Sequence, residues 1–315
     1  MKLKQLIAQY VAFRKSMGND FEKEERLFKT FCRAMGDEIE VADVTADRVK
    51  AFLDGAGPIT SYWHRKHTIL NGFYRYALSR GHSAVSPLPA VTPKHPERFV
   101  PYIYSHDELR RLLDGTDSYQ KQRILLEPYA FRAALLLLYG AGLRLSEALC
   151  LTLEDVNLQE AVIIVRDTKF YKTRLVPLGP ELNQAMNDYA HRCRREGHSQ
   201  DGSAPFFVTR AGARVPIYLI QRAFRRLCTQ VDVRRHDGAR FQPRLHDLRH
   251  SFAVSRLTSW YREGKNVQQL LPHLSTYLGH SDIASTQLYL TMTPELLQEA
   301  SVRFERYALK EVNDD

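Results

Sequence analysis

The sequence predicts a mainly α-helical protein with a small β-hairpin or sheet in its second half, an α+β arrangement. Apolar residues recur at helical spacing along most of the 315-residue chain, which indicates amphipathic helices. One pair of short β-rich runs between residues 162 and 178 interrupts this pattern. A proline-rich stretch divides the chain, so we expect an N-terminal helical domain over 1–85, a linker over 86–101 and a second domain over 102–315.

The N-terminal domain is expected to be a small bundle of helices separated by glycines. Their predicted ranges are Leu3–Lys15, Phe21–Met35, Ala46–Leu53 and Ile59–Ser79. The last range mixes aromatic residues with the basic residues Arg65, Lys66 and Arg75. This mixture fits a helix that faces DNA, and it fits equally well a core stripe with a solvated cationic face.

Five prolines between residues 86 and 101 remove backbone donors and favour extended backbone, which is typical of a linker. Directly after them, Ser105 and Glu108 have the spacing of a capping box, so a helix and a new domain begin there. In this domain we expect a strand pair at Val162–Val165 and Leu175–Leu178. The expected helices cover 129–139, 181–195, 216–230, 247–258, 266–278, 283–290 and 294–309.

The composition points to an acidic polymer as partner. A formal net charge of +9 and a pI near 9.3 favour nucleic acid ahead of a membrane surface. Charged residues interrupt the first segment of the chain every few positions, so we expect neither a signal peptide nor a membrane span, and we expect a cytoplasmic protein. The cysteines lie far apart, at Cys32, Cys150, Cys193 and Cys228, which argues against a disulfide framework and a zinc knuckle.

Several polar clusters supply the groups that phosphodiester transfer needs. This reaction requires a nucleophile in line with the phosphorus, cations on its oxygens and an acid for the departing 5′ oxygen. The clusters follow one another as Gly142–Glu147, Lys169 between the two strands, His246–Arg249, and Leu278–His280 followed by Tyr289. Each cluster alone is a weak signal, whereas their ordered combination on both sides of a basic hairpin is specific.

In this combination the sequence resembles the tyrosine site-specific recombinases, the phage-integrase and Xer-like family, over nearly the whole chain. The resemblance implies an N-terminal SAM-like helical bundle that binds core DNA and a tyrosine-recombinase catalytic domain. It implies DNA cleavage and rejoining through a 3′-phosphotyrosine, without a metal or other cofactor, for a mobile element or phage. The implied partners are double-stranded DNA and further copies of the chain, four in the synaptic complex, and no membrane.

Arg144 and Arg249 match the two arginines of the family. Each guanidinium can donate two hydrogen bonds to phosphate oxygens and stays charged at any working pH, so together they would stabilise the extra charge of a pentacoordinate phosphorus. Glu147 lies three residues after Arg144, on a neighbouring position of the same helix face. We expect Glu147 to orient Arg144 or to pack at the helix start, and a purely structural role stays open.

Lys169 matches the hairpin lysine of the family, whose ammonium would protonate the leaving 5′ oxygen. Lys172 competes for this role, because the tip lacks the glycines that are common at this turn in the family. Counting back from Arg174 and the strand that follows it selects Lys169. Lys172 and Arg174 are also candidates for contacts with DNA.

Tyr289, nine residues after His280, matches the nucleophile, whose attack would leave a 3′-phosphotyrosine and a free 5′ hydroxyl. His246 would be the acid/base partner near Tyr289, because imidazole titrates close to neutral pH, and His280 would donate a hydrogen bond to the phosphate. His246 and His250 also have the i, i+4 spacing of a helical metal pair. Arg249 beside them would repel a cation, so no metal is expected.

The interval from Arg249 to His280 is 31 residues, longer than is usual in Xer-like members, and residues 260–265 are the expected extra loop. Two other functions stay open. One is a type IB topoisomerase, which would relax supercoils with the same chemistry, and the other is a DNA-binding regulator whose site is a relic. A recombinase exchanges strands between two marked sites, whereas a topoisomerase does not. A recombinase also captures DNA covalently, whereas a regulator with a relic site only binds it.

Overall fold

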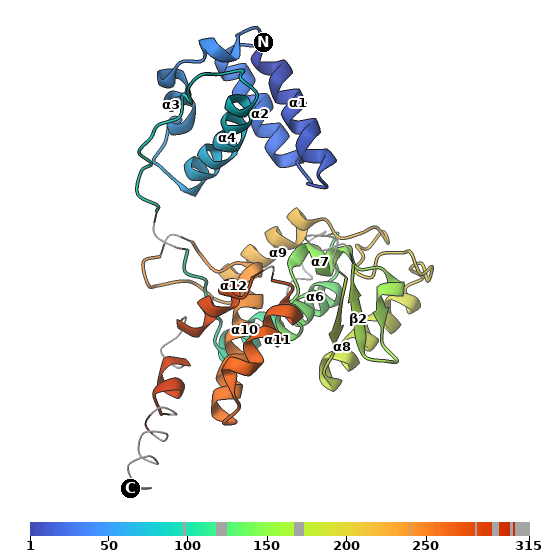
Figure 1. Ribbon diagram of the computed structural model, residues 1–315. Coiled ribbons are helices and arrows are strands. Elements are labelled where there is room, and N and C mark those ends of the chain that lie inside the picture. Colours follow the sequence, from blue (N-terminus) through green and yellow to red (C-terminus); the bar gives the residue numbers. More distant parts are fainter. Residues whose placement is uncertain are drawn as a thin grey trace. The chain divides into compact units, whose positions relative to one another are not determined.

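The computed structural model describes residues 1–96, 99–117, 125–166, 173–239, 241–280, 282–291, 296–302 and 305. The chain forms two compact units, Met1–Phe99 and Val100–Asp315 (Figure 1). The division falls inside the proline-rich stretch from which the sequence predicts a linker. Each unit buries a hydrophobic core of its own, so the two are described separately.

Helices α1 to α4 form the N-terminal unit and lie close to their predicted ranges. They are α1 (Leu3–Ser16), α2 (Glu22–Met35), α3 (Ala46–Asp54) and α4 (Ser61–Ser79), with a 3₁₀ turn at Val41–Asp43. Both α1 and α3 pack against α2 and α4. The buried ring of Tyr10 meets Phe28 and Phe73 edge-on, with centroids 5.9 and 5.8 Å apart. Aromatic packing therefore holds α1, α2 and α4 together.

The second unit is built around one buried helix. Its first helix, α5 (His106–Gly115), begins with the predicted capping box of Ser105 and Glu108. Helix α6 (Pro128–Gly140) is strongly apolar and packs against α8 and α10, which makes it the central element. The other helices and 3₁₀ turns are α7 (Leu145–Cys150), η3 (Leu153–Asp155), α8 (Pro180–Arg195), α9 (Ile217–Gln230), α10 (Leu245–Arg262), α11 (Val267–Leu278), α12 (Ala284–Gln287) and η4 (Leu288–Thr291).

A three-stranded antiparallel sheet of order β1-β2-β3 interrupts the helices, as predicted. Its strands are β1 (Val156–Asn157), β2 (Val162–Val165) and β3 (Arg174–Pro177). The register pairs Val165 with Arg174, so the tip of the β2–β3 hairpin lies beyond these two residues. Residues 167–172 of this tip, including Lys169 and Lys172, lie outside the described residues.

Helix α10 is longer than the sequence predicts. It continues through Arg262, so Trp260 and Tyr261, which were expected in an extra loop, lie in the helix. Both pack against a small apolar cluster formed by α10, α11 and Tyr289, and this burial favours the additional helical turn. Gly264, with φ of +69°, adopts the left-handed conformation that commonly ends a helix.

The segment around residue 289 also differs from the predicted single helix over 283–290. Short α12 gives way to the 3₁₀ turn η4, which carries Tyr289. The predicted helix over 294–309 lies partly outside the described residues; residues 296–302 are helical, and Leu296 packs into the same apolar cluster as Tyr289. Within the described ranges, no helix has the length and apolar character that crossing a membrane requires.

Candidate active site

Arg144 stands at the start of α7 and is held by Glu147 and a backbone carbonyl. Its backbone N–H donates to Glu147 Oε2 at 2.9 Å, and its Nη1 donates to Glu147 Oε1 at 2.6 Å. Its Nη2 donates to the carbonyl oxygen of Gly279 at 2.6 Å. The side chain keeps 31% of its surface exposed. Arg144 is therefore fixed from two sides and still open to a ligand.

Glu147 is shared between two arginines. Arg174, the first residue of β3, donates from Nη1 and Nη2 to the two carboxylate oxygens at 3.1 and 2.7 Å, and from Nε to the Tyr277 carbonyl at 2.9 Å. Burial raises the pKa of Glu147, but the bonds and charges of Arg174 and Arg144 outweigh it and lower the pKa to about 2. Glu147 is thus a permanent carboxylate. The sequence makes Arg174 a candidate for contacts with DNA. In the structure its guanidinium is largely buried and bound to Glu147 and to the Tyr277 carbonyl.

Arg249 on α10 is almost fully buried, with 2% of its surface exposed. Its Nη1 donates to the Gly142 carbonyl at 2.7 Å, and its Nη2 donates to the Leu278 carbonyl. Burial and the nearby charge of Arg144 lower the pKa of Arg249 to about 10. The guanidinium therefore stays protonated at neutral pH. Both of these hydrogen-bond partners are neutral carbonyls and not carboxylates, so Arg249 presents its positive charge next to Tyr289.

Two glycines let the backbone approach the arginines. Gly142 and Gly279 have φ of +61° and +68°, a conformation that favours glycine. A Cβ atom on Gly142 would lie 2.5 Å from the ring of Phe252, and one on Gly279 would lie 2.8 Å from a guanidinium nitrogen of Arg174. The Gly-Leu-Arg and Leu-Gly-His sequences therefore need glycine for conformation and for space.

Tyr289 points into the protein and has 2% of its surface exposed. The preceding turn is capped by Asp282, whose Oδ1 accepts a hydrogen bond from the backbone N–H of Ser285 at 2.9 Å. The Tyr289 hydroxyl lies 3.0 Å from Nδ1 of His250. Burial raises the pKa of Tyr289, while the positive charges of Arg249 and Arg144 act to lower it. The phenol therefore lies within the field of both arginines.

His250 and His280 lie next to the phenol, and His246 contacts the ring of His250. The His280 ring centroid is 6.0 Å from that of Tyr289, and Nδ1 of His280 lies 2.7 Å from the Thr286 hydroxyl. His246 meets His250 edge-on with centroids 4.9 Å apart. Burial first, and nearby positive charges second, lower the pKa of His246, of His250 to about 3 and of His280 to about 4. All three rings are neutral at neutral pH.

His250 is the residue that sequence reasoning missed at this site. We expected His246 beside the nucleophile, but the ring in hydrogen-bond contact with Tyr289 is His250, and His246 contacts that ring instead. The i, i+4 spacing predicts that both rings lie on one helix face, but as a sequence signal it indicates only a metal pair. Spacing along α10 cannot tell which ring faces Tyr289, because the tyrosine arrives on a separate element.

The predicted DNA contacts on α4 have different surroundings. Lys66 is buried, and its Nζ donates to the Phe52 carbonyl at 2.5 Å. Its ammonium therefore points into the protein, whereas a contact with DNA would require it to face solvent. Arg65 is exposed and pairs with Glu24 at 3.2 Å. Arg75 is exposed. The aromatic and basic mixture of α4 is thus partly a core stripe.

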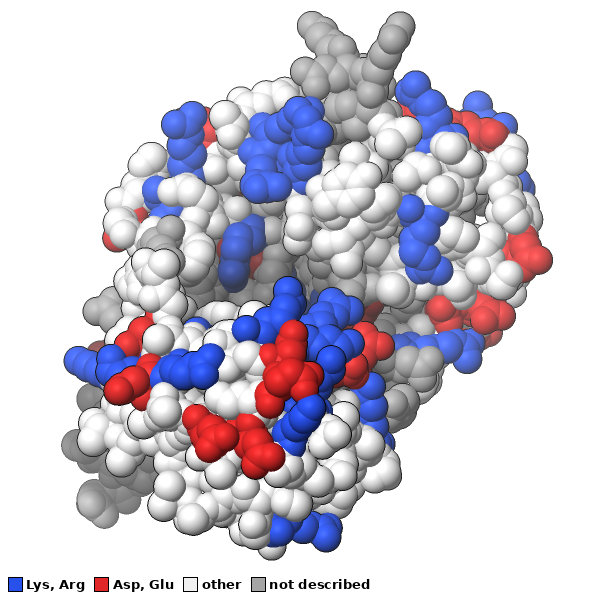
Figure 2. Space-filling view, turned by 90° about the horizontal axis from the view of Figure 1, so that it is seen from above, with Lys and Arg blue, Asp and Glu red and all other residues white. Residues whose placement is uncertain are grey.

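A hollow of about 610 Å³ opens beside Arg144 and His246 in the second unit. Basic and amide groups line it together with the apolar start of α9, namely Gln221, Arg225, Gln242, Arg244 and Ile217. On the face seen in Figure 2, Lys and Arg side chains occur in several groups, with Asp and Glu among them. The hollow is therefore suited in charge to an anionic ligand next to the arginines.

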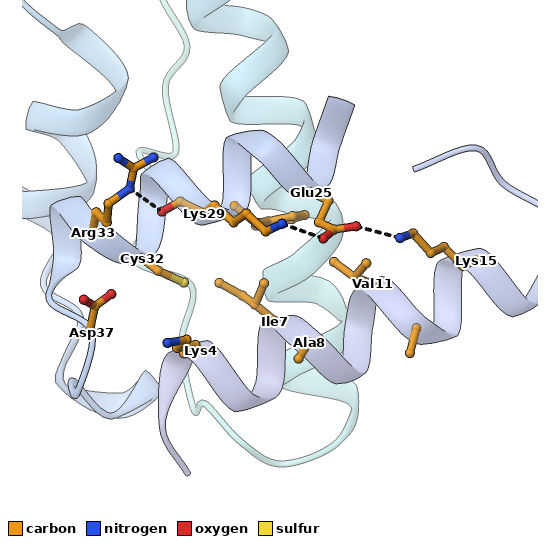
Figure 3. A pocket seen from close by; sticks show the side chains of 12 residues that line it. Lys4, Ile7, Ala8, Val11, Lys15, Glu25, Lys29, Cys32, Arg33 and Asp37 are labelled. Atoms are coloured by element: carbon orange, nitrogen blue, oxygen red, sulfur yellow. Dashed lines mark hydrogen bonds and ion pairs between the residues drawn. The ribbon is translucent and has the colours of Figure 1, made fainter. Parts of the chain in front are cut away.

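A second hollow, of about 770 Å³, belongs to the N-terminal unit and holds none of the motif residues. It lies between α1 and α2, and Figure 3 shows Ile7 and Val11 projecting toward it. Glu25 at its edge is paired with Lys15 and Lys29 at 2.6 and 2.9 Å. Arg33 and three lysines line this groove, but no tyrosine does, so it offers no phenol nucleophile for phosphoryl chemistry. In the described part of either unit, no group of three His, Cys, Asp or Glu residues is placed to hold a metal ion.

The chain matches a known family over most of its length. Residues 103–295 match the model of the phage integrase family. A Sinorhizobium fredii protein named as an integrase/recombinase, y4rB, is 34% identical over 306 residues, which cover 96% of this chain and 97% of that one. The tyrosine recombinase XerC of Chlorobaculum tepidum is 33% identical over 279 residues, covering 83% of this chain and 77% of that one.

Solved structures share the fold. The Tn1549 transposon integrase in complex with a circular intermediate DNA has a TM-score of 0.71 at 20% identity, covering 97% of this chain and 99% of that one. A lambda integrase tetramer bound to a Holliday junction has a TM-score of 0.65 at 16% identity, covering 92% and 77%. These likenesses confirm the predicted fold class. By its sequence matches, the chain belongs to the phage integrase family of tyrosine recombinases, enzymes that cleave and rejoin DNA strands.

Proposed function

We propose that this chain is a site-specific recombinase or integrase of a mobile element or phage, which cleaves DNA by attack of Tyr289 on a backbone phosphorus. Similarity to proteins named as an integrase/recombinase and as a transposon integrase supports the mobile-element role. The same matches offer no support for a type IB topoisomerase or for a regulator with a relic site.

One observation carries the proposal: motif residues that are far apart in sequence gather around a single phenol. The gathered residues are Arg144, His246, Arg249, His280 and Tyr289. Their charges fit the reaction, because the positive charges of two guanidinium groups act on the phenol that would attack and neutral imidazoles lie near it. A purely structural cluster would have no need of two arginine charges near a tyrosine hydroxyl, one of them on the buried side chain of Arg249.

In the proposed reaction Arg144 and Arg249 bind the non-bridging phosphate oxygens. A guanidinium has five N–H donors, so the two side-chain bonds that hold each arginine leave donors for a phosphate. Tyr289 Oη bonds to phosphorus, and the 5′ oxygen departs, which leaves a 3′-phosphotyrosine. His280 would add a hydrogen bond to the phosphate. A second 5′ hydroxyl can reverse the step on a new strand, because the linkage keeps the bond energy.

The test is covalent capture of DNA. The full chain is incubated with nicked duplexes of randomised sequence. Cleavage near the nick releases a short fragment that carries the free 5′ hydroxyl, and its loss traps the adduct. Protein-linked DNA is then recovered on a denaturing gel and sequenced. We expect an adduct with the natural chain and none with Tyr289→Phe, which loses only the attacking hydroxyl. An adduct that persists in Tyr289→Phe contradicts the assignment. The recovered sequence then serves as the defined substrate.

The acid for the leaving oxygen is proposed to be Lys169, which lies outside the described residues, with Lys172 as the alternative. Lys169→Ala should slow cleavage about 100-fold, the usual scale for loss of a general acid. DNA with sulfur in place of the bridging 5′ oxygen needs no acid, so it should restore the rate of this variant. Rescue of Lys172→Ala by that DNA, and not of Lys169→Ala, moves the role to Lys172.

We further propose that the two units grip duplex DNA from opposite faces and that four chains assemble in the synaptic complex. The tetramer of lambda integrase on a Holliday junction is the structural precedent. The positive net charge predicts binding that is driven by phosphates, with a salt slope of about −0.9 per neutralised phosphate. Binding that is independent of salt contradicts this proposal.

A further inference from the structure

The attacking hydroxyl is in hydrogen-bond contact with His250, which is not among the motif residues matched above, and Arg249 also acts on it. Its Nδ1 lies 3.0 Å from Tyr289 Oη, within the range from which a proton can pass directly. The ring is half-buried on α10, one turn after His246, whose edge it meets at a centroid distance of 4.9 Å. The His280 ring is stacked with the phenol at a centroid distance of 6.0 Å, and its Nδ1 lies 2.7 Å from the hydroxyl of Thr286.

We propose that His250 accepts the proton of the Tyr289 hydroxyl during DNA cleavage, and that His246 supports the His250 ring rather than touching the phenol. This inference rests on the proposed function. The step balances: the O–H bond of Tyr289 breaks, its oxygen bonds to phosphorus, and the proton moves to Nδ1 of His250. The bond from phosphorus to the 5′ oxygen breaks, and that oxygen takes a proton from the hairpin lysine. Religation reverses each transfer.

The charges around His250 make this transfer depend on DNA. The groups that face the ring are His246, Arg249 and Arg244 on or beside α10, together with His280 and the phenol. Burial and the positive charges of Arg249 and Arg244 keep the ring neutral, and in the tautomer with its proton on Nε2 the Nδ1 atom accepts a hydrogen bond from the phenol. A bound phosphate would pair with Arg249 and bring negative charge close to the ring. Both effects favour the imidazolium, so His250 becomes a stronger base when the scissile phosphate is in place.

The experiment separates proton acceptance from packing by changing the acidity of the phenol. The rate of adduct formation is measured in a single turnover on the captured DNA sequence. His250→Phe keeps a ring and loses the acceptor, and we expect the rate to fall about 100-fold. Replacing Tyr289 by 3,5-difluorotyrosine lowers the pKa of the attacking phenol. We expect this to speed His250→Phe at least 10-fold more than it speeds the chain with His250 intact.

Two further variants keep the outcome decisive. His250→Asn retains a hydrogen-bonding group near the hydroxyl but cannot accept its proton, so it should be slow and should be rescued by difluorotyrosine. His246→Phe, one helical turn away, is the matched control and should not show that rescue. Thermal unfolding and DNA binding of each variant confirm that it is folded.

The possible results are distinct. Equal acceleration by difluorotyrosine with and without His250, or a normal rate in His250→Asn, overturns proton acceptance by His250. Rescue confined to His246→Phe assigns the proton to His246. If the natural chain forms no adduct with any duplex of the randomised pool, the proposed function itself fails, before the role of His250 is reached.

Discussion

The two halves of the site hold their positive charge in different ways. On one side Arg144 and Arg174 share the buried carboxylate of Glu147. On the other side Arg249 is held by the carbonyls of Gly142 and Leu278. The first half is neutralised in part by a permanent anion, whereas the second keeps its full charge beside a phenol and neutral imidazoles.

This difference indicates in which half a bound phosphate would change the balance of charge. A carboxylate between two guanidinium groups fixes their positions and titrates only in strong acid, so the Glu147 half acts as a frame. The Tyr289 half lacks such a counter-ion among the hydrogen bonds described, and an arriving phosphate would supply it. We therefore expect substitutions in the Tyr289 half to change chemistry, and substitutions of Glu147 and Arg174 to change stability and the alignment of Arg144.

The largest effect should come from Arg249→Ala. Loss of the charge next to the phenol should lower the rate of adduct formation about 1000-fold, or about 4 kcal/mol in the activation free energy. Arg249→Lys, the matched control, keeps a charge but loses the fork that reaches both carbonyls, and should recover only part of the rate. If Arg249→Ala cleaves at a normal rate in a single-turnover assay, the contrast between the halves is broken.

Glu147→Gln should act mainly on stability. It removes the negative partner of buried Arg174 and of Arg144, and breaking a buried ion pair costs about 3–5 kcal/mol of unfolding free energy. Unfolding by urea can be followed in the second unit alone by Trp260 fluorescence in a Trp63→Phe background, since the chain has two tryptophans. A stable Glu147→Gln protein that cleaves slowly would move Glu147 from the frame into the chemistry.

Gly279→Ala should disturb the Glu147 half less severely than Glu147→Gln does. The added Cβ would lie 2.8 Å from Arg174 and 3.3 Å from Arg144, and the left-handed backbone at φ of +68° is strained for alanine. We expect a loss of about 1–3 kcal/mol in unfolding free energy. Gly18→Ala has a similar positive φ and open space around it, so it controls for backbone strain without the guanidinium contact. Equal losses in the two variants would show that the contact is unimportant.

The smallest effect is a change in how stability varies with pH. The pKa of His250 is lowered from 6.5 to about 3, so the unfolded chain takes up a proton first, and stability falls as pH drops below 6.5. His250→Gln should flatten this slope between pH 6 and 4.5 by about 1.4 kcal/mol per pH unit.

Glu147 titrates in a lower window. Its pKa is lowered from 4.5 to about 2, so its contribution to stability is present above pH 4.5 and is lost as pH falls toward 2. Glu147→Gln should therefore leave the slope between pH 6 and 4.5 unchanged. Urea titrations across this range check both variants, and a flatter slope in Glu147→Gln contradicts the separation of the two halves.

Much of the fold could be read from the sequence because its signals are local. Glycines bound α1 to α4, a capping box starts α5, and β-branched residues form β2. Each of these depends on neighbouring residues alone. The extension of α10 could not be predicted in this way, because Trp260 and Tyr261 become helical through packing against a cluster that includes Tyr289.

The site was predictable as a set of residues and not as a set of contacts. Motif order identifies Arg144, Arg249 and Tyr289 without geometry. The pairing of Arg174 with Glu147 joins residues 27 positions apart, and the burial of Lys66 depends on a carbonyl of α3. Neither leaves a trace in local spacing, because each is created by the packing of separate elements.

The β2–β3 hairpin is tied down at both stems. Arg166 donates to Asp155 at 2.5 Å where β2 ends, and Arg174 is bound to Glu147 where β3 begins. Both stems are therefore fixed by arginine–carboxylate pairs in which no residue of the tip takes part. If Lys169 is the acid, as proposed, substitutions at the tip would change the protonation of the departing 5′ oxygen separately from the binding of the DNA backbone by the arginines.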